Sequence, residues 1–389
     1  MMFVHNVTFQ NNLRYRTWAE IDLAAMKANL EYAKSVSGKP VICVIKGDAY
    51  GHGAVECGKY LQDNGADMFA VACIEEALEL RENGISIPIL ILGYTPSVFV
   101  KELSYYDLEQ TVVDVSHADE LNKAAEEAHV RIKVHIKIDT GMGRIGLYAH
   151  GHIGGRKVIE KAIDDAEHIY NLPHLNAVGL YTHFAVADCP DQFDYTEAQY
   201  KNYCEVRNGL IARGIHIEKC HVSNSAAIME YPDLHFDYVR EGIILYGMYP
   251  NSLPQEGPLK PVMTLKSRVA LVRDIPAGST ISYGRLYKAE HDMKVAVISI
   301  GYADGFPRRL TNTAIMTING KRYPQIGRVC MDMCMCDVTG SDVKRGDEVV
   351  IFGNGGISAE EIAVMTNTIN YEVTCDISRR AHTFYLNRE

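Results

Sequence analysis

The first two thirds of the 389-residue chain predict an α/β fold, a (β/α)8 barrel, and the remainder predicts a second, mostly β domain. Over residues 25–250, eight short apolar runs alternate with amphipathic stretches, which is the pattern of repeated βα units. This length matches the usual barrel size of about 250 residues. From about residue 258 the pattern changes to strand-like runs joined by Pro-Ala-Gly and Asn-Gly turns. A doubly wound open sheet is the alternative for the first part.

The eight apolar runs each have the length of a buried strand. They cover residues 40–46, 67–72, 88–94, 110–115, 131–138, 177–183, 218–223 and 242–247. Helical patterns cover residues 54–65, 73–84, 116–129 and 156–172, and several of them end near Gly or Asn. In the second part, strands are expected within residues 264–275, 279–287, 294–302, 314–338 and 347–353. We therefore expect an N-terminal segment associated with the β domain (1–18), the barrel (19–255) and the β-rich domain (256–389).

Composition excludes several classes of protein. Hydrophobic residues make up 47% of the chain and charged residues 23%, as in ordinary globular proteins. The net charge of −10 disfavours nucleic acid and anionic membrane surfaces as partners, because both attract basic faces. The first residues lack the basic and apolar regions of a signal peptide, and no run approaches the roughly 18 apolar residues of a membrane span. A cytoplasmic protein is expected.

The cysteines predict reduced thiols. Ten of them are scattered from Cys43 to Cys375 without C-x-x-C spacing. Cys330, Cys334 and Cys336 alternate along a predicted strand and lack a second chelating pair, so we expect no metal site.

Polar residues follow the ends of the predicted barrel strands, where such barrels carry their chemistry. Lys46 closes the first run and leads into a glycine-rich loop. A lysine there can form a Schiff base, since desolvation favours the neutral amine that attacks a carbonyl. Ser225 and Gly242 belong to the last two strands, where barrels commonly bind phosphate. A reactive lysine with a phosphate site suggests pyridoxal phosphate.

Each of these residues also has a structural interpretation. A lysine just past a strand is often a solvated strand end. Asn224 and Ser225 can cap the following helix, and Gly242 can be a turn. The residues taken singly leave both interpretations open.

Residues 141–146, Gly-Met-Gly-Arg-Ile-Gly, match the dinucleotide-binding fingerprint. Three more glycines follow before residue 156, so we expect no helix at Gly146 that could face a pyrophosphate. Arg144 in this loop is better interpreted as a ligand for a carboxylate. Lys137 faces inward from the fifth strand, so the two cations require a neutralising group.

Together these motifs resemble the alanine racemases, pyridoxal-phosphate amino-acid racemases of fold type III, from Thr17 to about Arg380. Residues 44–53, Val-Ile-Lys-Gly-Asp-Ala-Tyr-Gly-His-Gly, are similar to the cofactor-lysine signature, and residues 135–146 are similar to the motif of the fifth strand. The other similar segments are Tyr181-Thr-His183, residues 221–226, Val239-Arg-Glu-Gly-Ile243, Ser282-Tyr-Gly284, Gly301-Tyr302, Cys330-Met-Asp332 and Tyr371-Glu-Val373.

The resemblance implies a role for each site residue. The implied catalytic bases are Lys46 and Tyr283. The implied cofactor ligands are Lys46, Tyr50, His183, Asn224, Ser225, Arg240, Gly242, Ile243 and Tyr371. The implied substrate ligands are Arg144, Tyr302, Met331 and Asp332. Lys137 matches a position that is carbamylated in some members, where a carbamate would supply the missing negative charge. Members form homodimers in which second-domain residues reach into the barrel of the partner.

Two departures from the family accompany these matches. Gly47-Asp48 stands where relatives often have Ala-Asn, and Glu241 stands where they often have Pro. The acidic group beside Arg240 is the departure that bears on mechanism, since Arg240 is expected at the pyridine nitrogen.

Racemisation removes a proton from one face of Cα and delivers one to the other, so it needs two bases. The resemblance assigns Lys46 to the D face and Tyr283 to the L face. A guanidinium keeps its proton, so Arg240 would leave the pyridine nitrogen unprotonated and favour reprotonation over transamination. The expected function is alanine racemisation that supplies D-alanine for peptidoglycan. The alternatives are a serine racemase of the same family, a barrel-type amino-acid decarboxylase, and a cofactor carrier without turnover.

Overall fold

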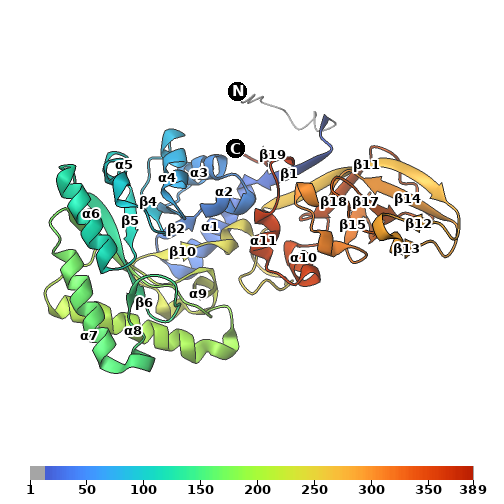
Figure 1. Ribbon diagram of the computed structural model, residues 1–389. Coiled ribbons are helices and arrows are strands. Elements are labelled where there is room, and N and C mark those ends of the chain that lie inside the picture. Colours follow the sequence, from blue (N-terminus) through green and yellow to red (C-terminus); the bar gives the residue numbers. More distant parts are fainter. Residues whose placement is uncertain (1–13, 389) are drawn as a thin grey trace. The chain divides into compact units, whose positions relative to one another are not determined.

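The computed structural model describes residues 14–388, which form two compact units (Figure 1). The barrel unit comprises Lys27–Asn251, and the β unit comprises residues 14–26 together with residues 252–388. Most of the expected N-terminal segment, residues 1–18, lies outside the described residues. Its association with the β domain and the boundaries expected after residues 18 and 255 stay predictions.

Eight parallel strands form the barrel unit. They are β2 (Val41–Val44), β3 (Met68–Val71), β4 (Ile89–Ile91), β5 (Glu109–Val112), β6 (Ile132–Asp139), β8 (Leu175–Tyr181), β9 (Lys219–His221) and β10 (Val239–Glu241). Their order is β10-β2-β3-β4-β5-β6-β8-β9, and a bridge between His221 and Tyr238 joins the two ends of this order. The strands are buried almost throughout, as expected for a parallel sheet covered by helices. The predicted barrel is confirmed.

The predicted eighth strand, residues 242–247, is wrong. The strand is β10, and Ile243–Tyr246 form the 3-10 turn η5, bounded by Gly242 and by a left-handed Gly247. All four residues of η5 are at most 1% exposed. The apolar run therefore reflects burial on every side, whereas the strand itself carries the polar pair Arg240 and Glu241, which an apolar pattern cannot indicate.

Helices connect the barrel strands (Figure 1). They are α1 (Leu23–Ser37), α2 (Lys46–Gly51), α3 (Ala54–Asp63), α4 (Ile74–Glu82), α5 (Val100–Tyr105), α6 (Val115–Glu127), α7 (Gly151–Tyr170), α8 (Phe193–Ala212) and α9 (Ser225–Glu230). The four predicted helical patterns correspond to α3, α4, α6 and α7. Among the described residues, no helix has the length and apolarity needed to cross a membrane.

The β unit is built on a second, mostly antiparallel sheet. Its order is β14-β17-β16-β15-β18-β11-β1-β19, and an additional pairing of β11 with β14 closes six of these strands into a ring. The bounds are β1 (Thr17–Asp22), β11 (Met263–Ile275), β14 (Met293–Ile298), β15 (Ile315–Ile318), β16 (Lys321–Ile326), β17 (Cys334–Asp337), β18 (Glu348–Phe352) and β19 (His382–Leu386). The long β11 contacts β1, β18 and β14 along its length. The predicted mostly β second domain is confirmed.

Smaller elements complete the β unit. They are the hairpin of β12 (Thr280–Ile281) and β13 (Tyr287–Lys288), the helices α10 (Ala359–Thr366) and α11 (Asn370–Cys375), and the turns η6 (Tyr283–Arg285) and η7 (Tyr302–Asp304). The hairpin packs on an apolar cluster that includes Ile281, Met293, Val295 and Ile326.

Candidate active site

The first feature of the site is a left-handed turn that begins just after Lys46. Residues Gly47, Asp48, Ala49 and Tyr50 have φ values of 60°, 52°, 53° and 53° within α2. Left-handed backbone costs about 1–2 kcal/mol for each residue that carries a Cβ, so only Gly47 adopts it without strain. Such strain persists where the surroundings enforce it, and it is concentrated at functional sites.

Two carboxylates hold this turn. Glu76 accepts hydrogen bonds from the backbone N–H of Gly47 and of Ala72, both at 2.7 Å. Asp48 accepts one from the N–H of Ala54, the first residue of α3, also at 2.7 Å. The departure at Asp48 therefore serves the start of the next helix, and the turn fixes the direction of the chain after Lys46.

Tyr50, Ser225 and Gly242 form a small buried cradle at the carboxyl ends of the strands. The N–H of Gly242 donates to Ser225 Oγ at 2.9 Å. A Cβ at Gly242 would lie 3.1 Å from the Tyr50 hydroxyl oxygen and 3.5 Å from Ser225 Oγ. Two hydroxyls and a backbone amide thus meet where a side chain would fill the space, which suits a phosphate-sized anion.

Asn224 and Ile243 lie next to the cradle in the chain, since Asn224 precedes Ser225 and Ile243 follows Gly242. Asn224 caps α9 by accepting from the N–H of Ala227 at 3.1 Å, so its structural interpretation as a helix cap is correct. Ile243 is fully buried and begins η5 directly after Gly242. The structure therefore places four predicted cofactor ligands, Asn224, Ser225, Gly242 and Ile243, in consecutive pairs next to Tyr50.

Arg240 is buried in β10, and five acceptors hold its two terminal nitrogens. Nη1 donates to His221 Nδ1 at 2.8 Å and to the His221 carbonyl at 3.0 Å. Nη2 donates to the carbonyls of Thr182 and Val222 at 2.8 and 2.9 Å, and to His183 Nδ1 at 3.3 Å. Burial lowers the pKa of Arg240 to about 10, which still leaves the guanidinium protonated at neutral pH.

Lys137 lies in the same interior, and few polar contacts compensate for the burial of its amino group. Its Nζ is 3.3 Å from the Ile138 carbonyl and 5.0 Å from the centre of the Tyr181 ring. Burial, followed by the charges of Arg240 and Arg144, places the pKa of Lys137 well below its ordinary value. Arg144 itself is exposed in the loop after β6. The expected crowding of cations is present, and the protein relieves it by favouring a neutral lysine.

The glycines of the fingerprint-like loop have a packing role. A Cβ at Gly146 would lie 2.8 Å from Lys137 Cγ, and its φ is 117°. A Cβ at Gly141 would lie 2.7 Å from the Tyr195 hydroxyl oxygen. The short strand β7 (Leu147–Tyr148) follows Gly146, and α7 begins only at Gly151. The loop therefore lacks the helix N-terminus that a dinucleotide site requires.

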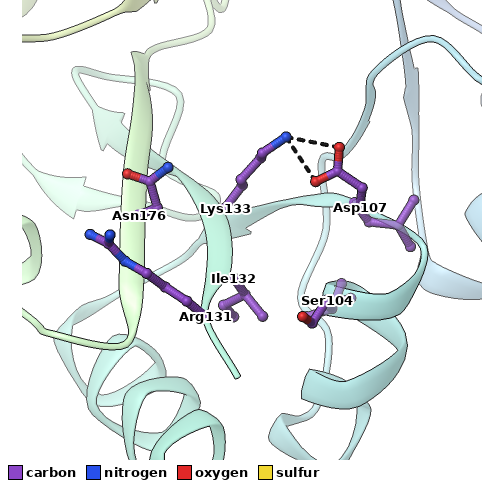
Figure 2. Close-up of a pocket in the computed structure, with 8 residues that line it drawn as sticks. Ser104, Asp107, Arg131, Ile132, Lys133 and Asn176 are labelled. Atoms are coloured by element: carbon purple, nitrogen blue, oxygen red, sulfur yellow. Dashed lines mark hydrogen bonds and ion pairs between the residues drawn. The ribbon is translucent and has the colours of Figure 1, made fainter. Parts of the chain in front are cut away.

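A separate small pocket lies at the amino-terminal side of the barrel strands (Figure 2). Arg131, Ile132 and Lys133 line it at the start of β6, and Lys133 Nζ pairs with Asp107 at 2.8 Å. Because parallel barrel strands carry their site residues at the opposite ends, this pocket is separate from the cradle.

The β unit brings three of its predicted site segments together. The N–H of Tyr302 donates to the Cys330 carbonyl at 3.1 Å, and the N–H of Ala303 donates to the Met331 carbonyl at 3.0 Å. Ser282, which precedes Tyr283, places its Oγ 3.4 Å from Cys330 Sγ. The side chains of Tyr283, Met331 and Tyr302 are 69%, 52% and 42% exposed.

Two more predicted residues of the β unit are Asp332, which directly follows Met331, and Tyr371. Asp332 pairs with Arg380 at 2.6 Å, and Tyr371 lies on α11. The pairing of Asp332 engages the carboxylate within the β unit.

Comparison with known proteins decides the family. Residues 21–250 match the family described as "Alanine racemase, N-terminal domain", and residues 262–385 match "Alanine racemase, C-terminal domain". The chain belongs to the alanine racemase family.

Individual alanine racemases agree closely with this chain. It is 43% identical to the alanine racemase of Clostridium novyi over 377 residues, covering 95% of each chain. It is 45% identical over 375 residues to that of Clostridium perfringens, again covering 95% of each. The solved alanine racemase of Clostridium difficile 630 is 40% identical, with a TM-score of 0.88 and coverage of 96% of this chain and 97% of that one. The resemblance found in the sequence is confirmed.

A solved alanine racemase of Bacillus anthracis with bound L-Ala-P is 35% identical, with a TM-score of 0.84 and coverage of 96% of this chain and 95% of that one.

The sequence did not assign a role to the buried residues that are linked to Arg240 by hydrogen bonds, which are His221, His135 and Glu109. The signal available was the inward phase of His135 and His221 on their strands.

Glu241, one of the two places at which the sequence is expected to depart from the family, lies beside Arg240 but pairs across the sheet with Cys43. Successive strand residues face opposite sides, so its carboxyl points away from the Arg240 side chain. The carboxyl is fully buried, and neither oxygen has a hydrogen-bond partner among the described residues. Burial places the pKa of Glu241 well above its ordinary value and so favours the neutral acid in the folded protein.

Replacing Glu241 by leucine should stabilise the fold by about 1–3 kcal/mol at pH 8, because a buried polar group without partners is removed. The folded pKa is raised, so folding is penalised once the unfolded carboxyl ionises. The part of the penalty that comes from ionisation is absent below the ordinary pKa of 4.5 and grows as pH rises, so the stability gain should be larger at pH 8 than at pH 5. Urea unfolding at pH 5 and pH 8 measures it. The exposed Glu256→Leu is the control, and an equal stability gain at both pH values would contradict the assignment.

Proposed function

We propose that this chain interconverts L- and D-alanine with pyridoxal phosphate bound at the carboxyl ends of the barrel strands. The observation that carries the proposal is that one barrel combines Lys46, the buried Arg240, and a cradle whose space is left open because Gly242 has no side chain. The residues that would hold the cofactor are Lys46, Tyr50, His183, Asn224, Ser225, Arg240, Gly242, Ile243 and Tyr371.

The residues present fit this cofactor in two places. The hydroxyls of Tyr50 and Ser225 with the N–H of Gly242 suit the phosphate, since a Cβ at Gly242 would occupy their common space. Arg240 offers only donors, which suits an unprotonated pyridine nitrogen. When bound, pyridoxal phosphate withdraws electrons from Cα and so eases removal of its proton.

Lys46 and Tyr283 would act as the two bases. Lys46 removes or returns the proton on the D face of Cα, and the Tyr283 hydroxyl does so on the L face. Arg144 would bind the substrate carboxylate, because a guanidinium matches its two oxygens. Tyr302, Met331 and Asp332 would line the substrate side of the site. Arg240 keeps its proton, which favours return of the proton to Cα over transamination.

A carbamate on Lys137 is part of the proposal. Carbamylation requires a neutral amine, and burial beside Arg240 and Arg144 favours that form. The added negative charge would offset one of the two positive charges of the guanidinium groups.

We further propose a homodimer with composite sites, in which Tyr283 acts in the barrel of the partner subunit. Its support is the exposure of large side chains in one linked region, since exposed apolar groups of this kind mark interaction surfaces. Leu286 and Met333 are 49% and 48% exposed beside the segments of Tyr283 and Met331. A composite site explains why the β unit carries an exposed tyrosine in the family motif.

Alanine is proposed as the substrate ahead of serine, in a cytoplasmic pathway that supplies D-alanine for peptidoglycan. The related structures support a small amino acid, since the Bacillus anthracis protein was solved with bound L-Ala-P and the Clostridium difficile one in complex with cycloserine. A decarboxylase of the same barrel class would place a carboxylate at the pyridine nitrogen. Here Arg240 carries the contacts to His183 and His221, and Glu241 faces away.

A chirality assay on purified protein with added pyridoxal phosphate tests the proposal. We expect D-alanine from L-alanine faster than D-serine from L-serine. Faster serine racemisation would reassign the substrate, and carbon dioxide release without inversion would replace the proposal by the decarboxylase.

A further inference from the structure

A chain of buried hydrogen bonds leads from Arg240 across the barrel interior. Arg240 Nη1 lies 2.8 Å from His221 Nδ1, and His221 Nε2 lies 3.0 Å from His135 Nδ1. His135 Nε2 lies 2.5 Å from Glu109 Oε2, and the other oxygen of Glu109 accepts from Lys219 Nζ at 2.6 Å. The chain crosses four strands, β10, β9, β6 and β5, and beyond Arg240 none of its residues is among those proposed to touch cofactor or substrate.

All hydrogen bonds between Arg240 and Glu109 run in one direction, from donor to acceptor, because Arg240 can only donate and an ionised Glu109 can only accept. Arg240 can only donate, so His221 Nδ1 must accept and His221 must carry its proton on Nε2. That proton is donated to His135 Nδ1, so His135 must also carry its proton on Nε2. An ionised Glu109 can only accept, and it receives this last proton. Both imidazoles are therefore neutral and each is held in one tautomer.

Packing shows that the chain is built into the barrel. His135, His221 and Glu109 are at most 2% exposed. A Cβ at Gly179 on β8 would lie 2.1 Å from His135 Nδ1, so only glycine leaves room for this imidazole. The Tyr181 ring stacks on His221 with centroids 4.7 Å apart. These contacts fix both rings as well as their protons.

The charges agree with this arrangement. Burial opposes ionisation of Glu109, but hydrogen bonds from His135 and Lys219 lower its pKa to about 2. Burial and the charge of Arg240 place the pKa of His221 well below its ordinary value, and burial lowers that of His135. A positive charge at Arg240 and a negative charge at Glu109 are thus separated by two neutral rings.

We propose that Glu109 is a positioning residue for Arg240, acting through His135 and His221 to fix their tautomers and hold the guanidinium in place. This inference rests on the proposed function, in which Arg240 faces the pyridine nitrogen. This chain of hydrogen bonds, the hydrogen-bond relay, keeps His221 Nδ1 as an acceptor for Arg240. It contains no group that would pass a proton toward the cofactor. Its effect is to protect racemisation from transamination.

The test uses the full-length protein with 15N-labelled histidine, first without and then with pyridoxal phosphate. In the wild type we expect two buried imidazoles with their protons on Nε2, unchanged between pH 6 and pH 9. Glu109→Leu removes the terminal acceptor, so the His135 proton is no longer held on Nε2. Arg240 Nη1 can then release His221 Nδ1 and still donate to the His221 carbonyl, and we expect mixed tautomers at His135 and His221. Glu109→Gln keeps an acceptor without charge, so it should retain the tautomers but move the His135 Nε2 proton signal upfield. Asp107→Asn, at the exposed ion pair with Lys133, is the matched control and should change neither signal.

The second readout is the fraction of turnovers that end in transamination. Glu109→Leu should raise it about tenfold or more, since loss of a carboxylate that fixes a histidine tautomer costs up to about 10⁴-fold in rate elsewhere. Glu109→Gln should fall between Glu109→Leu and the wild type, and Arg240→Glu should set the upper limit.

Wild-type tautomers and wild-type partitioning in Glu109→Leu would overturn the inference. If that variant does not fold, an unmoved His135 proton signal and unchanged transamination in Glu109→Gln would overturn it. The imidazole signals of the cofactor-free protein do not depend on turnover. A wild type that holds these tautomers but fails to racemise alanine would therefore contradict the proposed function and leave the hydrogen-bond relay standing.

Discussion

Replacing Lys46 by alanine should reduce alanine racemisation by about 10⁴-fold or more, because the side chain serves both as covalent anchor and as one of the two bases. Lys46 stands where a fully buried strand, β2, ends and the left-handed turn begins. The neighbouring cradle of Tyr50, Ser225 and Gly242 does not depend on the lysine side chain. The variant should therefore still bind the cofactor through its phosphate, while the protein-linked absorbance is lost.

D-alanine formation and borohydride-reducible cofactor linkage measure the two effects of this substitution. Lys133→Ala is the control, because Lys133 lies at the amino-terminal side of the barrel, paired with Asp107. Racemisation by Lys46→Ala within tenfold of the wild type, or a reducible linkage at another lysine, would remove Lys46 from the mechanism.

Tyr283→Phe should slow removal of the α-proton from L-alanine by about 10³-fold, within the range for loss of a general base. Removal from D-alanine, which falls to Lys46, should be affected much less. Tyr283 is 69% exposed in η6, so loss of its hydroxyl leaves the packing of the β unit unchanged. Exchange of the α-proton with deuterated solvent, followed separately from each enantiomer, measures the asymmetry.

Tyr287→Phe is the control for this substitution, since Tyr287 lies in the same hairpin and packs against the apolar cluster instead. It should leave both exchange rates unchanged. Equal slowing from both enantiomers in Tyr283→Phe would indicate a structural effect and would contradict its assignment to one face.

The barrel could be predicted from the sequence because parallel strands buried on both faces appear as short apolar runs. The same criterion failed at residues 242–247, where the apolar side chains of η5 are buried without forming a strand. It also passed over β10, whose polar residues Arg240 and Glu241 are fully enclosed. A run of apolar residues indicates that a segment is buried. It indicates a strand rather than a turn only where apolar residues alternate with polar ones.

The candidate site could be predicted where several family motifs occur together, as for Lys46, Ser225 and Arg240, because no single one of these residues decides between a structural and a chemical role. The left-handed turn at residues 47–50 could not, because Ala49 and Tyr50 are residues that rarely adopt it. The chain from His221 through His135 to Glu109 could not either, since it joins strands that are 26 to 86 residues apart in sequence. Only three-dimensional placement reveals which of the buried polar residues share protons.

The most direct test of the account is incubation of the wild-type protein and pyridoxal phosphate with L-alanine in deuterated water, with chiral analysis and mass measurement of the product. The account predicts D-alanine that carries solvent deuterium at Cα and retains its carboxylate. Loss of carbon dioxide, or deuterium exchange in L-alanine without formation of the D enantiomer, would contradict it.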